Sequence, residues 1–425
     1  MSEVRPFRAL RYDTHRVDLG RVIVPPYDVI AAEDREAFFD RDPHNAIRLE
    51  LTRELKDQST TDYAQIPETL AEWRSAGVLR RDSQPGLYPL RQRFTDPDGC
   101  EQVRQGFFAL LRLEDYERRI VRPHERTLEG PKADRLKVLR AAEANLSSVF
   151  TLYEDRHDEL AAVIGKAFDG SPLATATDET GMLHELAQLA DPADIAAVRD
   201  FMADRPLVIA DGHHRYETAL NYRNEKRKEQ PEAGPEAPWE FILVYLANAY
   251  APGTLLLPIH RLIVKGGVPT EAAWSDRLPG WSSQAVSITS PEELPALLAQ
   301  HLAPLANRRA FAVDDASGSL RIFSKPLEQD GELTIRVLHR EVIAGVFGLD
   351  EAAVAKGAID YPKSAVQTAV DLRRGRGAVA LYLNPLAPED VFRVTEAGDV
   401  LPQKSTFFYP KLPTGLVFRL HEEPG

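Results

Sequence analysis

A predicted strand, turn and helix follow one another directly over Leu207–Leu220, and no other stretch constrains the fold as strongly. Residues 207–210 are apolar and include two β-branched side chains. Asp211-Gly212 is a turn dipeptide, and apolar residues then return at helical spacing. The pattern predicts a buried strand that ends in a tight turn and leads directly into a helix.

Three basic side chains, His213, His214 and Arg215, fall in the first turn of this predicted helix. A helix N-terminus already carries partial positive charge and unpaired N–H groups, so basic residues are unfavourable there. A bound phosphate would resolve the conflict, and Gly212 would allow it a close approach. The alternative is an ordinary strand-to-helix turn with Asp211 as the N-cap and two hydrogen-bonded histidines.

The sequence Asp-Gly-His-His-Arg at 211–215 resembles the phosphate-binding box of the ParB/sulfiredoxin-like superfamily, which includes free-serine kinases. The longer stretch Ala210–Thr218 resembles the signature of the DUF1015 family, a domain of unknown function. Residues 25–30, 122–127 and 402–411 resemble the same family. This second resemblance extends over nearly the whole chain.

The alternation of predicted strands and helices indicates an α+β (mixed α/β) fold. The resemblance implies a ParB/sulfiredoxin-like nucleotide-binding core in residues 1–230. A charged run at 226–229, followed by several prolines and a glycine, marks the expected boundary. A second α/β region is expected over 236–425, contributing a loop that carries Lys404 and Lys411.

Composition narrows the class of protein. The chain has 425 residues, 43% of them hydrophobic, so it can bury a substantial core. A formal net charge of -13 argues against sequence-independent nucleic-acid binding. The single cysteine, Cys100, suits a reducing compartment, and neither a signal peptide nor a long apolar run occurs. We expect a cytoplasmic protein that binds a nucleotide and a small molecule, without membrane contact and with an oligomeric state left open.

A second stretch rich in charged and titratable side chains runs from Ile120 to Lys132. Prolines and a glycine keep it irregular, and it carries Arg122, His124 and Glu125. Loops on rigid scaffolds often hold functional groups, although a solvated charged loop is the alternative.

Three further segments lead to structural predictions. Pro25-Pro26 ends a short predicted strand and presents Asp28 in a turn. Residues 45–51 alternate as a half-buried strand whose Glu50 faces outward or lines a site. His184 is expected on an ordinary helix face.

Several motifs are absent or misplaced. No P-loop or zinc-ligand spacing occurs. Residues 375–380 match a dinucleotide fingerprint but precede a predicted strand instead of following one. Sulfiredoxin chemistry needs a cysteine where this chain has His213, and a ParB-like role would need a basic DNA-binding helix.

The resulting hypothesis is an ATP- or ADP-dependent phosphotransferase that acts on a small hydroxyl metabolite, with free L-serine as the first substrate to test. Asp211 would bind Mg²⁺ or the acceptor hydroxyl, and Glu125, with Asp28 second, would take the hydroxyl proton. Glu125 should therefore lie near His213. The phosphate ligands would be Gly212, His213, His214, Arg215, Arg122, His124, Lys404 and Lys411.

Two other functions fit the same box. One is a non-catalytic nucleotide-binding regulator, and the other is a phosphate-ester hydrolase. Replacing His214 or Arg215 by alanine is expected to weaken nucleotide binding and leave the fold intact.

Overall fold

The computed structural model describes residues 1–53, 61–97, 99–127, 129–328, 331–402 and 404–422. The chain divides into two compact units. The first comprises residues 1–255, 392–400 and 410–425, and the second comprises residues 256–391 and 401–409. Both contain helices and strands, which confirms the predicted α+β class. Within the described residues, no helix is both long enough and apolar enough to cross a membrane.

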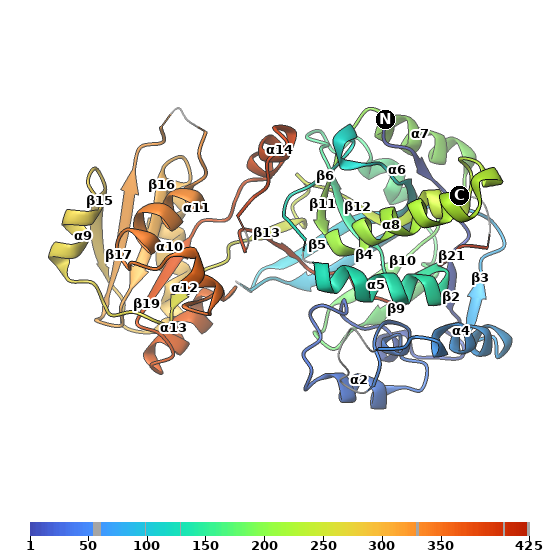
Figure 1. Cartoon of the computed structure of the whole chain (residues 1–425), viewed down its shortest axis with the longest axis horizontal. Helices are drawn as coiled ribbons and strands as arrows, with labels where there is room; N and C mark the ends of the chain where they lie inside the picture. Colours follow the sequence, from blue (N-terminus) through green and yellow to red (C-terminus); the bar gives the residue numbers. More distant parts are fainter. Residues whose placement is uncertain (54–60, 98, 128, 329–330, 403, 423–425) are drawn as a thin grey trace. The chain divides into compact units, whose positions relative to one another are not determined.

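A nine-stranded mixed sheet forms the centre of the first unit (Figure 1). Eight strands follow the order β6-β11-β8-β12-β5-β4-β10-β9, and β1 also pairs with β5. These strands are β1 (Val4–Arg5), β4 (Tyr88–Thr95), β5 (Glu101–Arg112), β6 (Val121–Pro123), β8 (Val149–Tyr153), β9 (Ala174–Thr177), β10 (Leu183–Leu186), β11 (Leu207–Asp211) and β12 (Phe241–Asn248).

The helices of this unit are α1 (Leu19–Val22), α2 (Arg35–Arg41), α3 (Ile47–Glu50), α4 (Gln65–Ser75), α5 (Glu129–Ala142), α6 (Ala161–Gly165), α7 (Pro192–Ala203) and α8 (His213–Glu229). Short pairs join β2 (Leu10–Tyr12) to β3 (Leu79–Arg81) and β7 (Ala144–Asn145) to β21 (Arg419–Leu420). Helices α5 and α8 pack side by side (Figure 1).

The main hydrophobic core lies between the sheet and helices α7 and α8. Leu207 and Ile209 of β11 are fully buried there with Tyr216 of α8. Alternate residues of a strand face the same side, so the short apolar run fixes which face of β11 the next helix must cover. This packing holds the start of α8 at the end of a buried strand, as predicted for Leu207–Leu220.

The second unit is built on a six-stranded sheet with the order β15-β17-β16-β19-β14-β18. Its strands are β14 (Arg261–Ile263), β15 (Ser282–Ser287), β16 (Arg309–Asp314), β17 (Ser319–Lys325), β18 (Ile359–Asp360) and β19 (Val379–Leu383). Its helices are α9 (Glu271–Arg277), α10 (Leu294–His301), α11 (Thr334–Val337), α12 (Glu351–Ala355) and α13 (Ala365–Arg373), with a π-helix over Leu338–Ala344.

The unit boundary differs from the one expected at 230–236. Strand β12 lies beyond that point, yet it pairs with β5 and β8 inside the large sheet of the first unit. The proline-rich stretch is therefore a connection between α8 and β12 within one unit. The chain passes between the units within β13 (Leu255–Leu257) and α14 (Pro388–Glu396), and again after residues 400 and 409.

Three secondary-structure predictions were wrong. The short strand expected before Pro25-Pro26 is a helical turn, α1, over Leu19–Val22. Residues 45–51 form a helical turn, α3, because the Asn45 side chain accepts a hydrogen bond from the Ile47 N–H and donates to the Arg21 carbonyl. This local bonding replaces a strand ladder. His184 lies on β10, between β4 and β9, where its Nε2 is 2.8 Å from Asp178.

Candidate functional site

The junction between β11 and α8 has no capping side chain. Gly212 occupies the N-cap position with φ +89°, in the left-handed region, and it offers no side chain to the first helical turn. Asp211, the alternative N-cap, instead belongs to the strand. The first-turn N–H groups of α8 thus lack the oxygen that a Ser, Thr, Asn or Asp cap would supply.

Asp211 joins two cations at this junction. Its Oδ2 accepts from Arg215 Nη2 at 2.6 Å, and its Oδ1 contacts Lys411 Nζ, 200 residues further along the chain. Burial opposes ionisation of Asp211, but Lys411 and Arg215 outweigh it and lower its pKa to about 2. Asp211 is therefore an ionised carboxylate that fixes both cations.

Arg215 is held in place more firmly than a phosphate ligand on an open surface. Its side chain is 11% exposed, and Nη1 donates to the Ser148 carbonyl. Losing it would leave Asp211 and a buried carbonyl with fewer partners. The expectation that Arg215→Ala leaves the fold intact is thus corrected, because this guanidinium is part of the packed interior.

Glu125 lies next to His213, as the sequence predicted. Its Oε1 is 3.2 Å from His213 Nδ1, although 88 residues separate the two. The Glu125 side chain is 41% exposed and that of His213 only 2%. Burial raises the pKa of Glu125, but the hydrogen bond from His213 and the charges of His213 and His124 together outweigh burial and lower the pKa to about 2. The site therefore presents an ionised carboxylate to solvent, backed by a buried imidazole.

His124 completes this group and fixes its hydrogen bonding. Its backbone N–H lies 3.3 Å from His213 Nε2, and its own Nδ1 donates to the Ile209 carbonyl. A backbone N–H can only donate, so His213 Nε2 must accept. The proton of neutral His213 is then on Nδ1, which donates to Glu125.

This hydrogen bonding argues against a metal centre here. His124, Glu125 and His213 bring potential ligand atoms within 4.8 Å of one another. A metal-bound histidine uses one nitrogen as ligand and carries its proton on the other. A metal on His213 Nδ1 would require a proton on Nε2, but the His124 N–H already points at Nε2. Nδ1 in turn carries the proton that it donates to Glu125. The cluster therefore fits a chain of proton donors and acceptors better than a cation.

Of the other predicted site residues, His214 and Asp28 are near the start of α8, whereas Arg122 and Lys404 have other partners. His214 lies in the first turn of α8, and burial lowers its pKa, while Glu125, Glu217 and Asp28 oppose that shift. Asp28 is exposed and lies within electrostatic reach of His214 and Arg215. Arg122 instead directs its Nε to the Arg119 carbonyl, 3.0 Å away. Lys404 belongs to the second unit, where its carbonyl accepts from Arg261.

Sequence reasoning missed a buried ion cluster beside α8. Arg135 Nη1 donates to Glu50 Oε2 at 2.9 Å, and its Nη2 donates to Asp134 at 2.6 Å. Tyr63 donates to Asp134, and the ring of Tyr27 lies 4.0 Å from the Arg135 guanidinium. An adjacent Asp-Arg pair on a helix that must pack against α8 was the available signal, but the strand prediction for residues 45–51 concealed Glu50.

Comparison with known proteins identifies the family. The model for "Protein of unknown function (DUF1015)" matches residues 4–292, which include the Glu125 loop, β11 and α8. The chain belongs to the DUF1015 family. Lys404 and Lys411 lie outside the matched range. No curated protein matches the chain.

Solved structures show only distant similarity to this DUF1015 chain. A conserved hypothetical protein from Pyrococcus furiosus is 12% identical, with a TM-score of 0.34 and coverage of 74% of this chain and 97% of its own. A free serine kinase in complex with ADP is 10% identical, with a TM-score of 0.35 and coverage of 73% and 92%. SbnI from Staphylococcus aureus is 12% identical, with a TM-score of 0.36 and coverage of 74% and 87%. Similarity at this level carries no argument about activity.

Gly212→Ala tests the packing at the junction. An added Cβ would lie 2.9 Å from Arg215 Nε and would also force a left-handed alanine, a conformation that costs about 1–2 kcal/mol. Gly181→Ala is the matched control, because Gly181 has φ +83° with nothing within 4 Å. In urea unfolding, Gly212→Ala should lose at least about 1 kcal/mol more than Gly181→Ala. Equal losses would show that Arg215 does not press against Gly212.

His124 predicts a pH dependence of stability. Burial and the neighbouring His213 lower its pKa to about 3, whereas an unfolded histidine titrates near 6.5. The unfolded chain therefore takes up the proton first, and the free energy of unfolding should fall as pH drops from about 6.5 towards 3, by up to about 1.4 kcal/mol per pH unit.

Urea unfolding at pH 7, 6 and 5 measures this slope. His124→Gln should make the slope less steep but not abolish it, because burial also lowers the pKa of His260, His339 and His421. The exposed control His157→Gln should leave the slope as in the wild type. The same slope in all three proteins would contradict a buried neutral His124.

Proposed function

We propose that this chain binds the phosphate groups of ATP or ADP at the first turn of α8 and transfers a phosphoryl group to a small hydroxyl metabolite. Free L-serine is the first acceptor to test. The observation that carries the proposal is the uncapped N-terminus of α8, which meets His214, Lys411 and an ionised Glu125 at one junction. Phosphate at a helix N-terminus accepts from backbone N–H groups and is favoured by the helix dipole.

Each side chain of the junction has a role in this proposal. The first-turn N–H groups and His214 hold the phosphate oxygens. Lys411 neutralises phosphate charge, and Asp211 positions it together with Arg215. The Asp211, Arg215 and Lys411 group carries a formal net charge of +1, since two cations meet one carboxylate. The excess cation of this group would compensate part of the charge of a bound phosphate.

The transfer step places Glu125 at the acceptor. The acceptor oxygen forms a bond to the terminal phosphorus, while the bond from that phosphorus to the bridging oxygen breaks. The departing nucleotide keeps the electron pair, and the hydroxyl proton passes to Glu125. A carboxylate of low pKa is a weak base, which suits a loose phosphoryl-transfer transition state in which positioning and charge neutralisation supply most of the catalysis.

Mg²⁺ at Asp211 stays a prediction. Mg²⁺ prefers carboxylate and phosphate oxygens. Both Asp211 oxygens already face a cation, so direct coordination would require Arg215 or Lys411 to move. The roles proposed for Glu125, His214 and Lys411 do not depend on that coordination.

Replacing the proposed phosphate ligands should weaken nucleotide binding. Titration calorimetry with ADP should give affinities reduced on the order of 10-fold for both His214→Ala and Lys411→Gln, because a hydrogen bond to a charged group contributes about 1.5–3 kcal/mol. Lys228→Ala, an exposed lysine near the other end of α8, is the control and should bind as the wild type does. Wild-type affinity in both site variants would overturn the phosphate site.

Replacing Glu125 should separate binding from chemistry. Glu125→Gln keeps the shape but removes the proton acceptor, so ADP and ATP affinity should stay within about 3-fold while turnover with L-serine falls by about 10²–10⁴. Asp28→Asn tests the second carboxylate in the same assay. If Asp28→Asn abolishes turnover and Glu125→Gln does not, the base is Asp28.

A further inference from the structure

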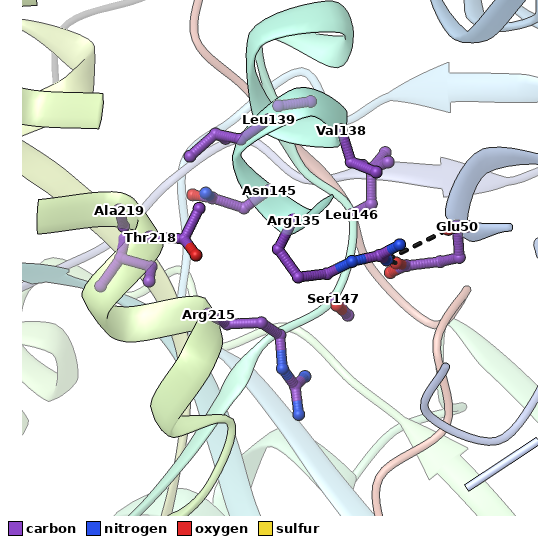
Figure 2. Close-up of a pocket in the computed structure, with 12 residues that line it drawn as sticks. Glu50, Arg135, Val138, Leu139, Asn145, Leu146, Ser147, Arg215, Thr218 and Ala219 are labelled. Carbon is purple, nitrogen blue, oxygen red and sulfur yellow. Dashed lines mark hydrogen bonds and ion pairs between the residues drawn. The ribbon is translucent and has the colours of Figure 1, made fainter. Parts of the chain in front are cut away.

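A buried arginine of the large sheet, Arg104 on β5, binds the chain segment that carries Lys411. Taking a charged group out of water is costly unless good hydrogen bonds offset the loss. Arg135 of α5 meets this need with the carboxylate of Glu50, beside a small cavity that Arg215 also lines (Figure 2). Arg104 is fully buried as well, and it donates to a side-chain amide and to a backbone carbonyl. These two acceptors show what its guanidinium holds in place.

Three buried polar side chains lie in a row across neighbouring strands at this arginine. In the register of the sheet, His184 of β10 is opposite Gln92 of β4, and Gln92 is opposite Arg104. Opposite residues of paired strands project from the same face of a sheet, so the three side chains are neighbours. Arg104 Nε donates to Gln92 Oε1 at 2.9 Å, and the amide nitrogen of Gln92 lies 3.3 Å from His184 Nδ1. The pairing of three strands thus brings an oriented acceptor to the guanidinium.

The hydrogen bonds of this row allow one orientation of the guanidinium. The Gln92 amide nitrogen can only donate, so His184 Nδ1 accepts, and His184 Nε2 donates to Asp178 at 2.8 Å. The amide oxygen of Gln92 then faces Arg104 and accepts from both Nε and Nη2. The centre of the Phe150 ring lies 4.9 Å from the guanidinium carbon. Arg104 is thereby fixed, with Nη1 on the edge opposite Gln92.

Nη1 of Arg104 reaches the last segment of the chain. It donates to the Pro410 carbonyl at 2.6 Å, although 306 residues separate the two. Pro410 is where the chain returns to the first unit for the last time. Further along, Thr414 and Val24 form a β-bridge with backbone hydrogen bonds of 2.8 and 3.1 Å. Lys411 therefore lies between two points at which the backbone is held.

We propose that Arg104 is a positioning residue of the phosphate site. By fixing the Pro410 carbonyl it places the Lys411 ammonium at the junction, where Asp211 binds it. Lysine carries its charge on a flexible four-carbon stem, so the position of the ammonium depends on where the backbone is held. Losing the Arg104 bond leaves Lys411 its charge but lets it spend less time at the junction. This inference deepens the proposed function and rests on it for one point, the role of Lys411 as a phosphate ligand.

ADP titrations compare two buried arginines. Arg104→Met removes the guanidinium and should lose on the order of 10-fold in ADP affinity, as expected for Lys411→Gln. Arg419→Met is the matched control, because Arg419 is buried in the same C-terminal segment and donates its Nη1 to the Phe241 carbonyl. It should stay within about 3-fold of the wild type. Urea unfolding shows which variants are folded, and if Arg104→Met is not, Arg104→Lys takes its place, since an ammonium lacks the planar fork of arginine.

A double-mutant cycle separates positioning from a general loss of structure. If Arg104 acts through Lys411, adding Arg104→Met to Lys411→Gln should change ADP affinity by less than about 3-fold, because the residue that Arg104 positions is already gone. Losses that multiply in the double variant would overturn the inference, as would wild-type ADP affinity in Arg104→Met.

The reactivity of Lys411 tests the positioning without a nucleotide. Brief acetylation with acetic anhydride, read residue by residue by mass spectrometry, reports how often the Lys411 nitrogen leaves Asp211. Relative to the exposed Lys228, Lys411 should react at least about 3-fold faster in Arg104→Met than in the wild type. Arg419→Met should leave that ratio unchanged. The same ratio in Arg104→Met and the wild type would overturn the inference.

The two readouts separate this inference from the proposed function. Faster Lys411 acetylation in Arg104→Met, with no ADP binding by the wild type, would remove the proposed function and keep the placement of Lys411 by Arg104. ADP binding that weakens in Lys411→Gln but not in Arg104→Met would remove the positioning role alone.

Discussion

The ion pairs of Asp211 are the interaction on which the site depends. They connect the end of β11 to the first turn of α8 through Arg215, and to Lys411 from the far end of the chain. A carboxylate largely shielded from water needs such partners, and removing either cation would take a hydrogen-bonding partner from one of its two oxygens. Gly212 belongs to the same arrangement, since the Arg215 guanidinium occupies the space that a side chain at that position would need.

A second buried ion cluster, formed by Glu50, Asp134 and Arg135, adjoins the first. The two have opposite formal charge: two cations and one carboxylate at Asp211, and two carboxylates and one cation at Arg135. Arg215 contributes to the first cluster and lines the cavity that Glu50 and Arg135 also line. Of the two clusters, the one at Asp211 is therefore the one that suits a bound anion.

The sequence predicted the parts of this site that depend on local rules. The apolar run before Asp211-Gly212 predicted β11 and the start of α8, and the need for a carboxylate near phosphate predicted Glu125 beside His213. It could not predict that the Arg215 side chain would be only 11% exposed, because that follows from contacts with Asp211 and Ser148. Glu50 was placed on a strand, since the Asn45 side-chain bonds that form α3 leave no trace in the apolar pattern. Pairing of Lys411 with Asp211 is a contact over 200 residues that no local pattern encodes.

A crystal structure of the chain with ADP tests the central claim most directly, because the claim concerns where the phosphate groups bind. The account predicts phosphate oxygens about 2.7–3.2 Å from backbone nitrogens of the first turn of α8, with Lys411 in contact with the same group. Phosphates bound away from His213–Arg215, with the first-turn N–H groups facing only water or protein, would contradict it.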